Sequence, residues 1–154
     1  MSGVSPLGLI LELGYNWVPH FDIRQGGTML SSLTALRFEI SKKYRKEIRP
    51  IQIRDNQDLK PDGFCFISDG FVYEKGWVPA DFLLVADPGD REHELLGIEP
   101  YPVFFEPMLN MRLFVSPEKS QVNLSQLGLL TYTSEDVLLL YLRRALGIEA
   151  LFFA

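Results

Sequence analysis

The spacing of apolar residues changes at Pro50, and this change constrains the fold more than any other feature of the sequence. Before the proline, apolar side chains recur every three or four residues, as on one face of a helix: Met29, Leu33, Leu36, Ile40 and Tyr44. Thr28 precedes this stripe and is a suitable N-cap. After the proline, Ile51 and Ile53 alternate with polar residues, which is typical of a strand with one buried face. The chain therefore combines helices with sheets.

Short apolar runs separated by turn residues predict several more strands. They lie at 7–13, 64–67, 71–73, 82–85, 113–115 and 129–132. Asp69-Gly70 joins two of these runs and is a strong hairpin signal. The prolines of the segment 98–110 exclude a regular helix there.

Two more helices follow from cap residues. Ser116-Pro117-Glu118 predicts the start of a short helix that runs to about Leu127. Ser134-Glu135-Asp136 predicts the capped start of a last helix, which we expect to end at Gly147 in a left-handed C-cap. We expect the apolar residues 151–153 to be exposed, so that the chain either packs them on a partner or was cut from something longer. The predicted fold class is mixed α/β (α+β), with small mixed sheets and helices packed on them.

Composition and charge favour a globular protein that does not bind nucleic acid. The 154 residues are 47% hydrophobic and 23% charged, and the formal net charge is −5. Such a molecule repels phosphate backbones and anionic lipid. The N-terminal segment has neither a basic start nor an unbroken apolar run, so we expect no signal peptide or membrane span. We expect a soluble chain in the cytoplasm, where its one cysteine, Cys65, stays a buried, inert thiol.

No residue pattern predicts catalysis, a metal site or a cofactor. His20 and His93 have no His or Cys at ligand spacing. The loop acids Asp55, Asp58 and Asp62 lack the glutamate that completes a calcium loop. Glu99 and Glu106 have no neighbours that would make them an acid and base pair.

Aromatic residues in loops and at the ends of elements favour a role in protein binding instead. They are Tyr15, Trp17, Phe21, Trp77, Tyr101, Phe104 and Phe105. The alternative is that most of them complete a small core. On the residues alone, the chain is an acidic interaction domain.

Two polar clusters have both a structural and a functional interpretation. Arg54-Asp55-Asn56 follows a predicted strand, where Asp55 and Asn56 are suited to bond the backbone of the next turn and Arg54 to pair with a nearby carboxylate. The basic residues Lys42, Lys43, Arg45 and Lys46 complement the negative end of the first helix, or form a phosphate-binding patch.

The order and spacing of short motifs over about eighty residues resemble the cytosolic domain of the FHIPEP family, whose members serve flagellar biosynthesis and virulence-associated type III secretion. The matching residues are Glu12-Leu13-Gly14-Tyr15, Pro19, Asp22, Gln25-Gly26-Gly27, Ile53-Arg54-Asp55-Asn56, Leu59, Pro61, Gly70, Gly76 and Pro88-Gly89. Further on, Glu106-Pro107, Gly128 and Arg143-Arg144 keep the family spacing. The family usually continues Glu-Pro with Ala-Phe-Gly-Leu, whereas this chain has Met108-Leu109-Asn110-Met111. The family's transmembrane half is absent from the sequence, so the chain is a fragment or a reduced homologue.

The resemblance implies a non-enzymatic role as the cytosolic platform of an export gate. Its partners would be export chaperone–substrate complexes and proteins associated with the export ATPase, and parts that this chain lacks would build an oligomeric ring. The implied organisation is a first subdomain at 1–78 plus 134–154, with a second subdomain at 79–133 inserted into it.

The resemblance also implies a hydrophobic dimple that accepts the chaperone. Carried over by position, the dimple's acid and aromatic fall at Glu106 and Leu109, its wall at Phe82, Leu83, Leu84 and Pro88, and its threonine at Leu140. An apolar groove of this kind fits helix-in-groove recognition. The alternatives are a stand-alone interaction module, a small nucleotide-binding enzyme that uses Arg54 and Asp55, and nucleic-acid binding through residues 42–49.

Overall fold

The computed structural model describes residues 8–86, 103–117 and 130–152, and its helices and sheets confirm the α+β class. The chain divides into two compact units. Unit 1 comprises Met1–Val78 and Leu139–Ala154, and unit 2 comprises Pro79–Leu138.

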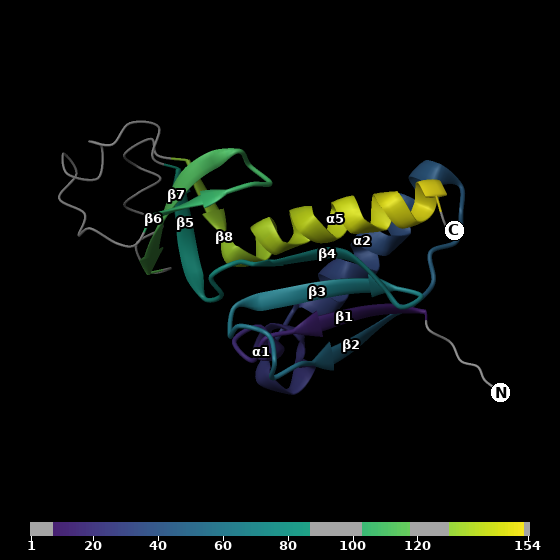
Figure 1. Cartoon of the computed structure of the whole chain (residues 1–154), viewed down its shortest axis with the longest axis horizontal. Helices are drawn as coiled ribbons and strands as arrows, with labels where there is room; N and C mark the ends of the chain where they lie inside the picture. Colours follow the sequence, from purple (N-terminus) through teal and green to yellow (C-terminus); the bar gives the residue numbers. More distant parts are fainter. Residues whose placement is uncertain (1–7, 87–102, 118–129, 153–154) are drawn as a thin grey trace. The chain divides into compact units, whose positions relative to one another are not determined.

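Unit 1 is built on a four-stranded mixed sheet. Its elements are β1 (Leu9–Leu13), α1 (Val18–Phe21), the 3-10 helix η1 (Ile23–Gln25), α2 (Met29–Tyr44), β2 (Ile51–Asp55), β3 (Gly63–Ser68) and β4 (Phe71–Trp77), with most of α5 (Ser134–Phe152). The strand order is β2-β1-β3-β4, in which β1 and β2 are parallel and the other pairs antiparallel. The parallel pair requires a crossover, and α2 lies in that connection (Figure 1).

Helix α2 begins and ends where the apolar spacing predicts. Met29, Leu33, Leu36 and Ile40 are buried, as one stripe of an amphipathic helix requires. Thr28 is the N-cap residue, but its side chain makes no capping hydrogen bond. The helix ends at Tyr44, and the C-cap residue Arg45 has a φ of 55°, so a non-glycine residue takes the left-handed cap conformation.

The predicted hairpin joins β3 to β4. Asp69 and Gly70 have φ angles of 48° and 88°, so both central residues of the turn are left-handed. This is the turn whose twist matches two antiparallel strands, which explains the Asp-Gly sequence.

Within unit 1, α5 packs against β3 and β4 of the sheet. The rings of Tyr141 and Phe64 lie 5.1 Å apart, and Arg144 makes two hydrogen bonds of 2.8 Å to Glu74 on β4. The predicted C-cap at Gly147 is wrong, because α5 continues through this residue to Phe152. Packing of the residues around Gly147 accompanies this continuation, since Leu146, Glu149 and Ala150 are all buried.

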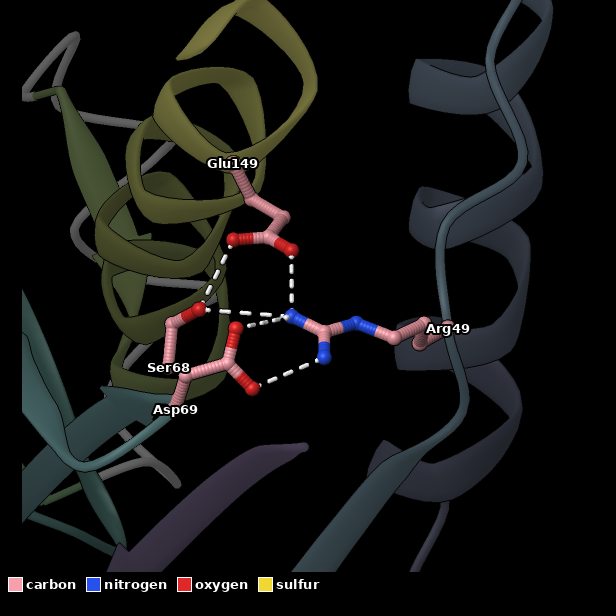
Figure 2. A network of polar contacts seen from close by, with 4 residues as sticks. All are labelled: Arg49, Ser68, Asp69 and Glu149. Atoms are coloured by element: carbon pink, nitrogen blue, oxygen red, sulfur yellow. Dashed lines mark hydrogen bonds and ion pairs between the residues drawn. The ribbon is translucent and has the colours of Figure 1, made fainter. Parts of the chain in front are cut away.

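A buried carboxylate on α5 is the centre of a polar network (Figure 2). Glu149 accepts hydrogen bonds from Arg49 Nη2 at 2.7 Å and from Ser68 Oγ at 2.8 Å. Arg49 also donates to both carboxylate oxygens of Asp69, at 2.9 and 3.1 Å. One arginine therefore connects the segment after α2, the β3–β4 turn and the last helix. Its two carboxylate partners raise the pKa of Arg49, and Arg49 lowers the pKa of Asp69.

Unit 2 contains a four-stranded sheet with the order β6-β7-β5-β8. Its strands are β5 (Phe82–Ala86), β6 (Val103–Glu106), β7 (Met111–Pro117) and β8 (Thr131–Thr133), and all three pairs are antiparallel. The predicted start of a helix at Ser116 and Pro117 is wrong, because both residues continue strand β7, and the rest of the helix predicted to about Leu127 falls outside the described residues. At the start of α5, the prediction that Ser134 is the cap is wrong, since Thr133 Oγ1 accepts the hydrogen bond from the Asp136 amide at 3.1 Å.

Candidate partner-binding site

The turn between β6 and β7 carries two residues of the expected dimple. Glu106 is 1% exposed, and its Oε1 accepts a hydrogen bond from the Met108 amide at 3.1 Å. The turn closes through the Asn110 amide, which donates to the Pro107 carbonyl, and Asn110 has a φ of 53°. Leu109 is half-buried. Glu106 thus shapes the turn from inside the unit, while Leu109 keeps part of its surface open to a partner.

Strand β5 provides the wall residues of the expected dimple. Leu83 and Leu84 are fully buried in the central strand of the sheet, whereas Phe82, at the end of the strand, is exposed. Side chains alternate along a strand, so Phe82 and Leu84 share one face. Of these three residues, only Phe82 is available to a partner without opening of the unit.

The other two expected site residues are Leu140 and Pro88. Leu140 lies on α5 within unit 1 and is half-buried. Pro88 lies outside the described residues.

The seven aromatic residues divide between core and surface. Trp17 is buried and donates from Nε1 to the carbonyls of Val78 and Asp62, at 3.0 and 3.2 Å, and Phe21 is buried too. Tyr15, Trp77 and Phe105 are exposed. Tyr101 and the Phe104 side chain lie outside the described part of the chain. Leu130 is a further exposed apolar residue of unit 2 that no sequence pattern singled out.

Neither a metal site nor a membrane span is present in the described part of the chain. Within those ranges, no group of three His, Cys, Asp or Glu side chains is placed to hold a metal ion. None of the described helices combines the length and apolarity that a bilayer crossing requires. Cys65 is buried, and burial raises the pKa of its thiol, as expected for an inert cysteine.

In the Arg54-Asp55-Asn56 triplet, Asn56 is the residue whose side chain forms hydrogen bonds. Asn56 Oδ1 accepts from the Asp58 amide at 2.9 Å, which confirms the predicted turn bond, and Nδ2 donates to Glu12 Oε1 at 3.0 Å. Among the described residues, the side chains of Arg54 and Asp55 make no hydrogen bond or ion pair. The predicted pairing of Arg54 is therefore wrong, because its side chain extends into solvent from an edge strand. The predicted bond from Asp55 to the turn backbone is wrong as well, since Asn56 makes the turn bond and Asp55 is exposed.

Asp55 instead borders an apolar cleft of about 540 Å³ in unit 1. Phe21, Leu30 and Ile53 line the cleft, and Asp22 stands at its edge. Hydrogen bonds from Gln25 and Arg24 lower the pKa of Asp22, which caps η1 by accepting from the Arg24 amide at 2.9 Å. The acid thus fixes the short helix beside the cleft.

Two glycines of the family-like motifs are required by close backbone contacts. A Cβ at Gly14 would lie 2.1 Å from the Lys60 carbonyl oxygen, and one at Gly27 would lie 2.4 Å from the His20 carbonyl oxygen. Neither position has room for any other residue. These motif residues, like the Asn56–Glu12 pair, specify the fold of unit 1.

Comparison with known protein families shows which family has these sequence motifs. The FHIPEP family profile matches residues 2–150. The chain belongs to the FHIPEP family. This FHIPEP chain is 33% identical over 90 residues to the flagellar biosynthesis protein FlhA of Helicobacter pylori, and 31% identical over 98 residues to FlhA of Treponema pallidum. The matches cover 58% and 63% of this chain but only 12% and 14% of those relatives, so it spans a small part of their length.

Solved structures of proteins with low sequence identity share the fold of this FHIPEP chain. The Chlamydia pneumoniae CdsV protein superposes with a TM-score of 0.70 at 17% identity, covering 92% of this chain and 42% of CdsV. CdsV in its complex with the CdsO protein gives a TM-score of 0.69 at 16% identity, covering 92% and 44%. A cytoplasmic domain of Salmonella InvA gives 0.63 at 16% identity, covering 94% and 81%.

Proposed function

We propose that this FHIPEP chain is a non-enzymatic platform domain of a flagellar or type III protein export gate. It docks export chaperones with their substrates and proteins of the export ATPase complex, on the cytosolic face of the bacterial inner membrane. The family match over residues 2–150 is the observation that carries this proposal. The described residues add support, since they offer exposed apolar side chains such as Phe82 and Phe105.

The docking surface in this proposal is the exposed side chain of Phe82 at the end of β5, because Leu84 and Ala86 on the same face of the strand are buried. The registers place Phe82 in line with Ala86, and Ala86 opposite Leu113 of β7. Phe105 pairs with Arg112, one residue away from Leu113, so it lies on the opposite face. The chain thus has an exposed phenylalanine on each face of one sheet. The proposal assigns the chaperone to Phe82. Leu109 lies in the β6–β7 turn beyond the other end of β7, because Phe82 pairs with Pro117 and Met111 begins that strand.

Calorimetry with the purified chain tests this proposal. A chaperone encoded beside this gene, alone or with its cargo, should bind with a Kd in the micromolar range or below. Phe82→Ser should weaken that binding about tenfold, because an exposed aromatic anchor carries a large share of an interface's energy. Phe105→Ser is the matched control and should bind like the parent chain.

Two results would contradict the proposal in different ways. If no such chaperone binds, the docking function is wrong. If binding occurs and only Phe105→Ser weakens it, the docking function stands but the partner occupies the other face of the sheet.

A further inference from the structure

A cleft with a concentrated positive charge lies at the carboxyl end of α2. Its volume is about 510 Å³, and we name it the basic cleft after the residues that line it: Arg37, Phe38, Lys42, Arg45, Lys46 and Ile48. All of them belong to unit 1. The site of the proposed export function uses none of them.

Local hydrogen bonds give the basic cleft its shape. Arg45 takes the left-handed conformation, and the amides of Arg45 and Lys46 both donate to the Ser41 carbonyl. The Ile48 amide then donates to Ser41 Oγ at 3.0 Å, which returns the chain alongside the helix. Ile48 is buried, so its packing fixes the segment that forms one wall of the cleft.

The charge around the basic cleft differs in sign from that of the whole chain. Four cations border it together with a single carboxylate, Glu47, whereas the chain has a net charge of −5. None of these four cations forms an ion pair with another residue of the described ranges. The helix dipole accounts for cations in the last turn, such as Lys42. It does not account for Arg37, which lies two turns from the end.

Phe38 adds an apolar contact to the basic cleft. Its side chain is 73% exposed, although it lies on a helix whose other stripe is fully packed. Lys42 and Arg45 follow it at positions i+4 and i+7, so they share its face of α2. An exposed ring bordered by cations is suited to a ligand that carries an apolar group between negative charges.

We propose that the basic cleft binds a short acidic peptide segment of a protein partner. The segment would place an apolar side chain against Phe38 and its carboxylates among Arg37, Lys42, Arg45 and Lys46. The concave shape favours a peptide over a flat membrane surface. A polyphosphate backbone fits less well, because the field of the acidic chain opposes a long polyanion.

Fluorescence anisotropy with a labelled peptide, Glu-Glu-Phe-Leu-Glu-Glu, tests the proposal. The acidic peptide should bind, and its binding should weaken as the salt concentration is raised. The peptide Lys-Lys-Phe-Leu-Lys-Lys, which carries the opposite charge, should not bind. Phe38→Ser should weaken binding about tenfold. Phe71→Ser is the matched control, since Phe71 is also 73% exposed but lies at the β3–β4 hairpin.

Two double variants distinguish binding in the basic cleft from non-specific attraction of the acidic peptide to positive charge elsewhere on the chain. Lys42→Gln/Lys46→Gln and Lys60→Gln/Lys75→Gln change the net charge equally, but only the first pair lines the basic cleft. The first should weaken binding about tenfold and the second should not. Thermal melts of all variants verify folding.

Three results would overturn the proposal. The first is that the acidic peptide does not bind at about 1 mM, which is well above the Kd of a weak specific site. The second is that both double variants weaken binding equally. The third is that phosphatidylglycerol vesicles bind through the cleft residues and the peptide does not. Chaperone binding through Phe82 can fail or succeed independently, because it uses residues of unit 2.

Discussion

At the scale of single residues, Arg49 has the most influence on unit 1, because its partner Glu149 is a charge that water does not reach. The Glu149 side chain is 1% exposed and that of Arg49 is 41% exposed. Leaving a buried charge unpaired costs about 3–5 kcal/mol. Water can partly replace Arg49, and Ser68 still donates to Glu149. We therefore expect Arg49→Met to lower the free energy of unfolding by about 1–3 kcal/mol in urea denaturation.

Two further variants test whether the unpaired Glu149 charge causes the loss of stability in Arg49→Met. Arg143→Met removes an exposed pair with Glu39 and should change the free energy of unfolding by less than about 0.5 kcal/mol. Glu149→Gln removes the charge but retains an acceptor for Ser68, so adding it to Arg49→Met should restore stability. Additive losses in the double variant would contradict the argument.

The pH dependence of stability should contain a contribution from Asp69. Its pKa is lowered below the usual 3.8, first by the hydrogen bonds from Arg49. A lowered folded pKa gives stability that is present above pH 3.8 and is lost as the pH falls through the folded value. The Asp69 and Arg49 side chains are 50% and 41% exposed, so screening limits the effect to about 0.2–1 kcal/mol.

Asp69→Asn tests this sign. Asn tolerates the left-handed conformation of the turn, so the substitution removes the charge and leaves the hairpin. We expect the variant to be less stable than the parent chain at pH 7 and the difference to shrink below pH 3.8, measured by urea denaturation at several pH values. A difference that is constant with pH would exclude the charge as its cause.

Single residues were predictable from the sequence only where their partners are local. Asn56 bonds the turn two residues ahead, and this was predicted from its residue type and position. The long-range partners were not. Arg54 was expected to pair and extends into solvent, whereas Arg49 reaches Glu149, one hundred positions away. No sequence spacing encodes such a contact.

At the scale of elements, a substitution of Gly147 tests whether α5 continues through this residue to Phe152. A glycine inside a helix costs about 0.5–1 kcal/mol relative to alanine. The new methyl group would meet only the Tyr44 hydroxyl at 4.0 Å, an ordinary contact. We therefore expect Gly147→Ala to raise the free energy of unfolding by about 0.5–1 kcal/mol.

Gly14→Ala is the contrasting control, since its Cβ would overlap the Lys60 carbonyl oxygen. It should destabilise the chain clearly in the same thermal or urea melts. Destabilisation by Gly147→Ala as well would favour the left-handed C-cap that the sequence suggests.

Elements were predictable where one local signal decided them. The apolar spacing gave the bounds of α2, and Asp69-Gly70 gave the β3–β4 hairpin. The end of α5 was not predictable, because glycine is both a common C-cap and tolerated within a packed helix. The sheet orders and the crossover between β1 and β2 likewise depend on contacts between distant segments.

At the scale of the whole molecule, the candidate site came from the family resemblance and not from the residues themselves. Burial then divides that set: Leu83, Leu84 and Glu106 lie inside unit 2, and Phe82 remains on the surface. A sequence position gives a residue type but not its exposure, which depends on strands that pair from far apart. The basic cleft shows the same limit, since its cations were visible in the sequence but their shared concave surface was not.

The single cysteine makes the independence of the two units measurable. Cys65 is buried in β3 of unit 1, and burial raises the pKa of its thiol, so a thiol reagent reacts only when unit 1 opens. Leu36 and Leu113 are buried leucines of units 1 and 2. Replacing a buried leucine with alanine costs about 2–5 kcal/mol, which corresponds to an increase of about 30-fold or more in the open population.

We expect Leu36→Ala to accelerate labelling of Cys65 by about 30-fold or more under native conditions, and Leu113→Ala to leave the rate nearly unchanged. Each unit has its own sheet and its own buried residues, so loss of packing in one need not open the other. A rate proportional to reagent concentration verifies that opening equilibrates before labelling. Equal acceleration by both variants would mean that the two units unfold as one cooperative body, and the inserted subdomain would then depend on unit 1 for its stability.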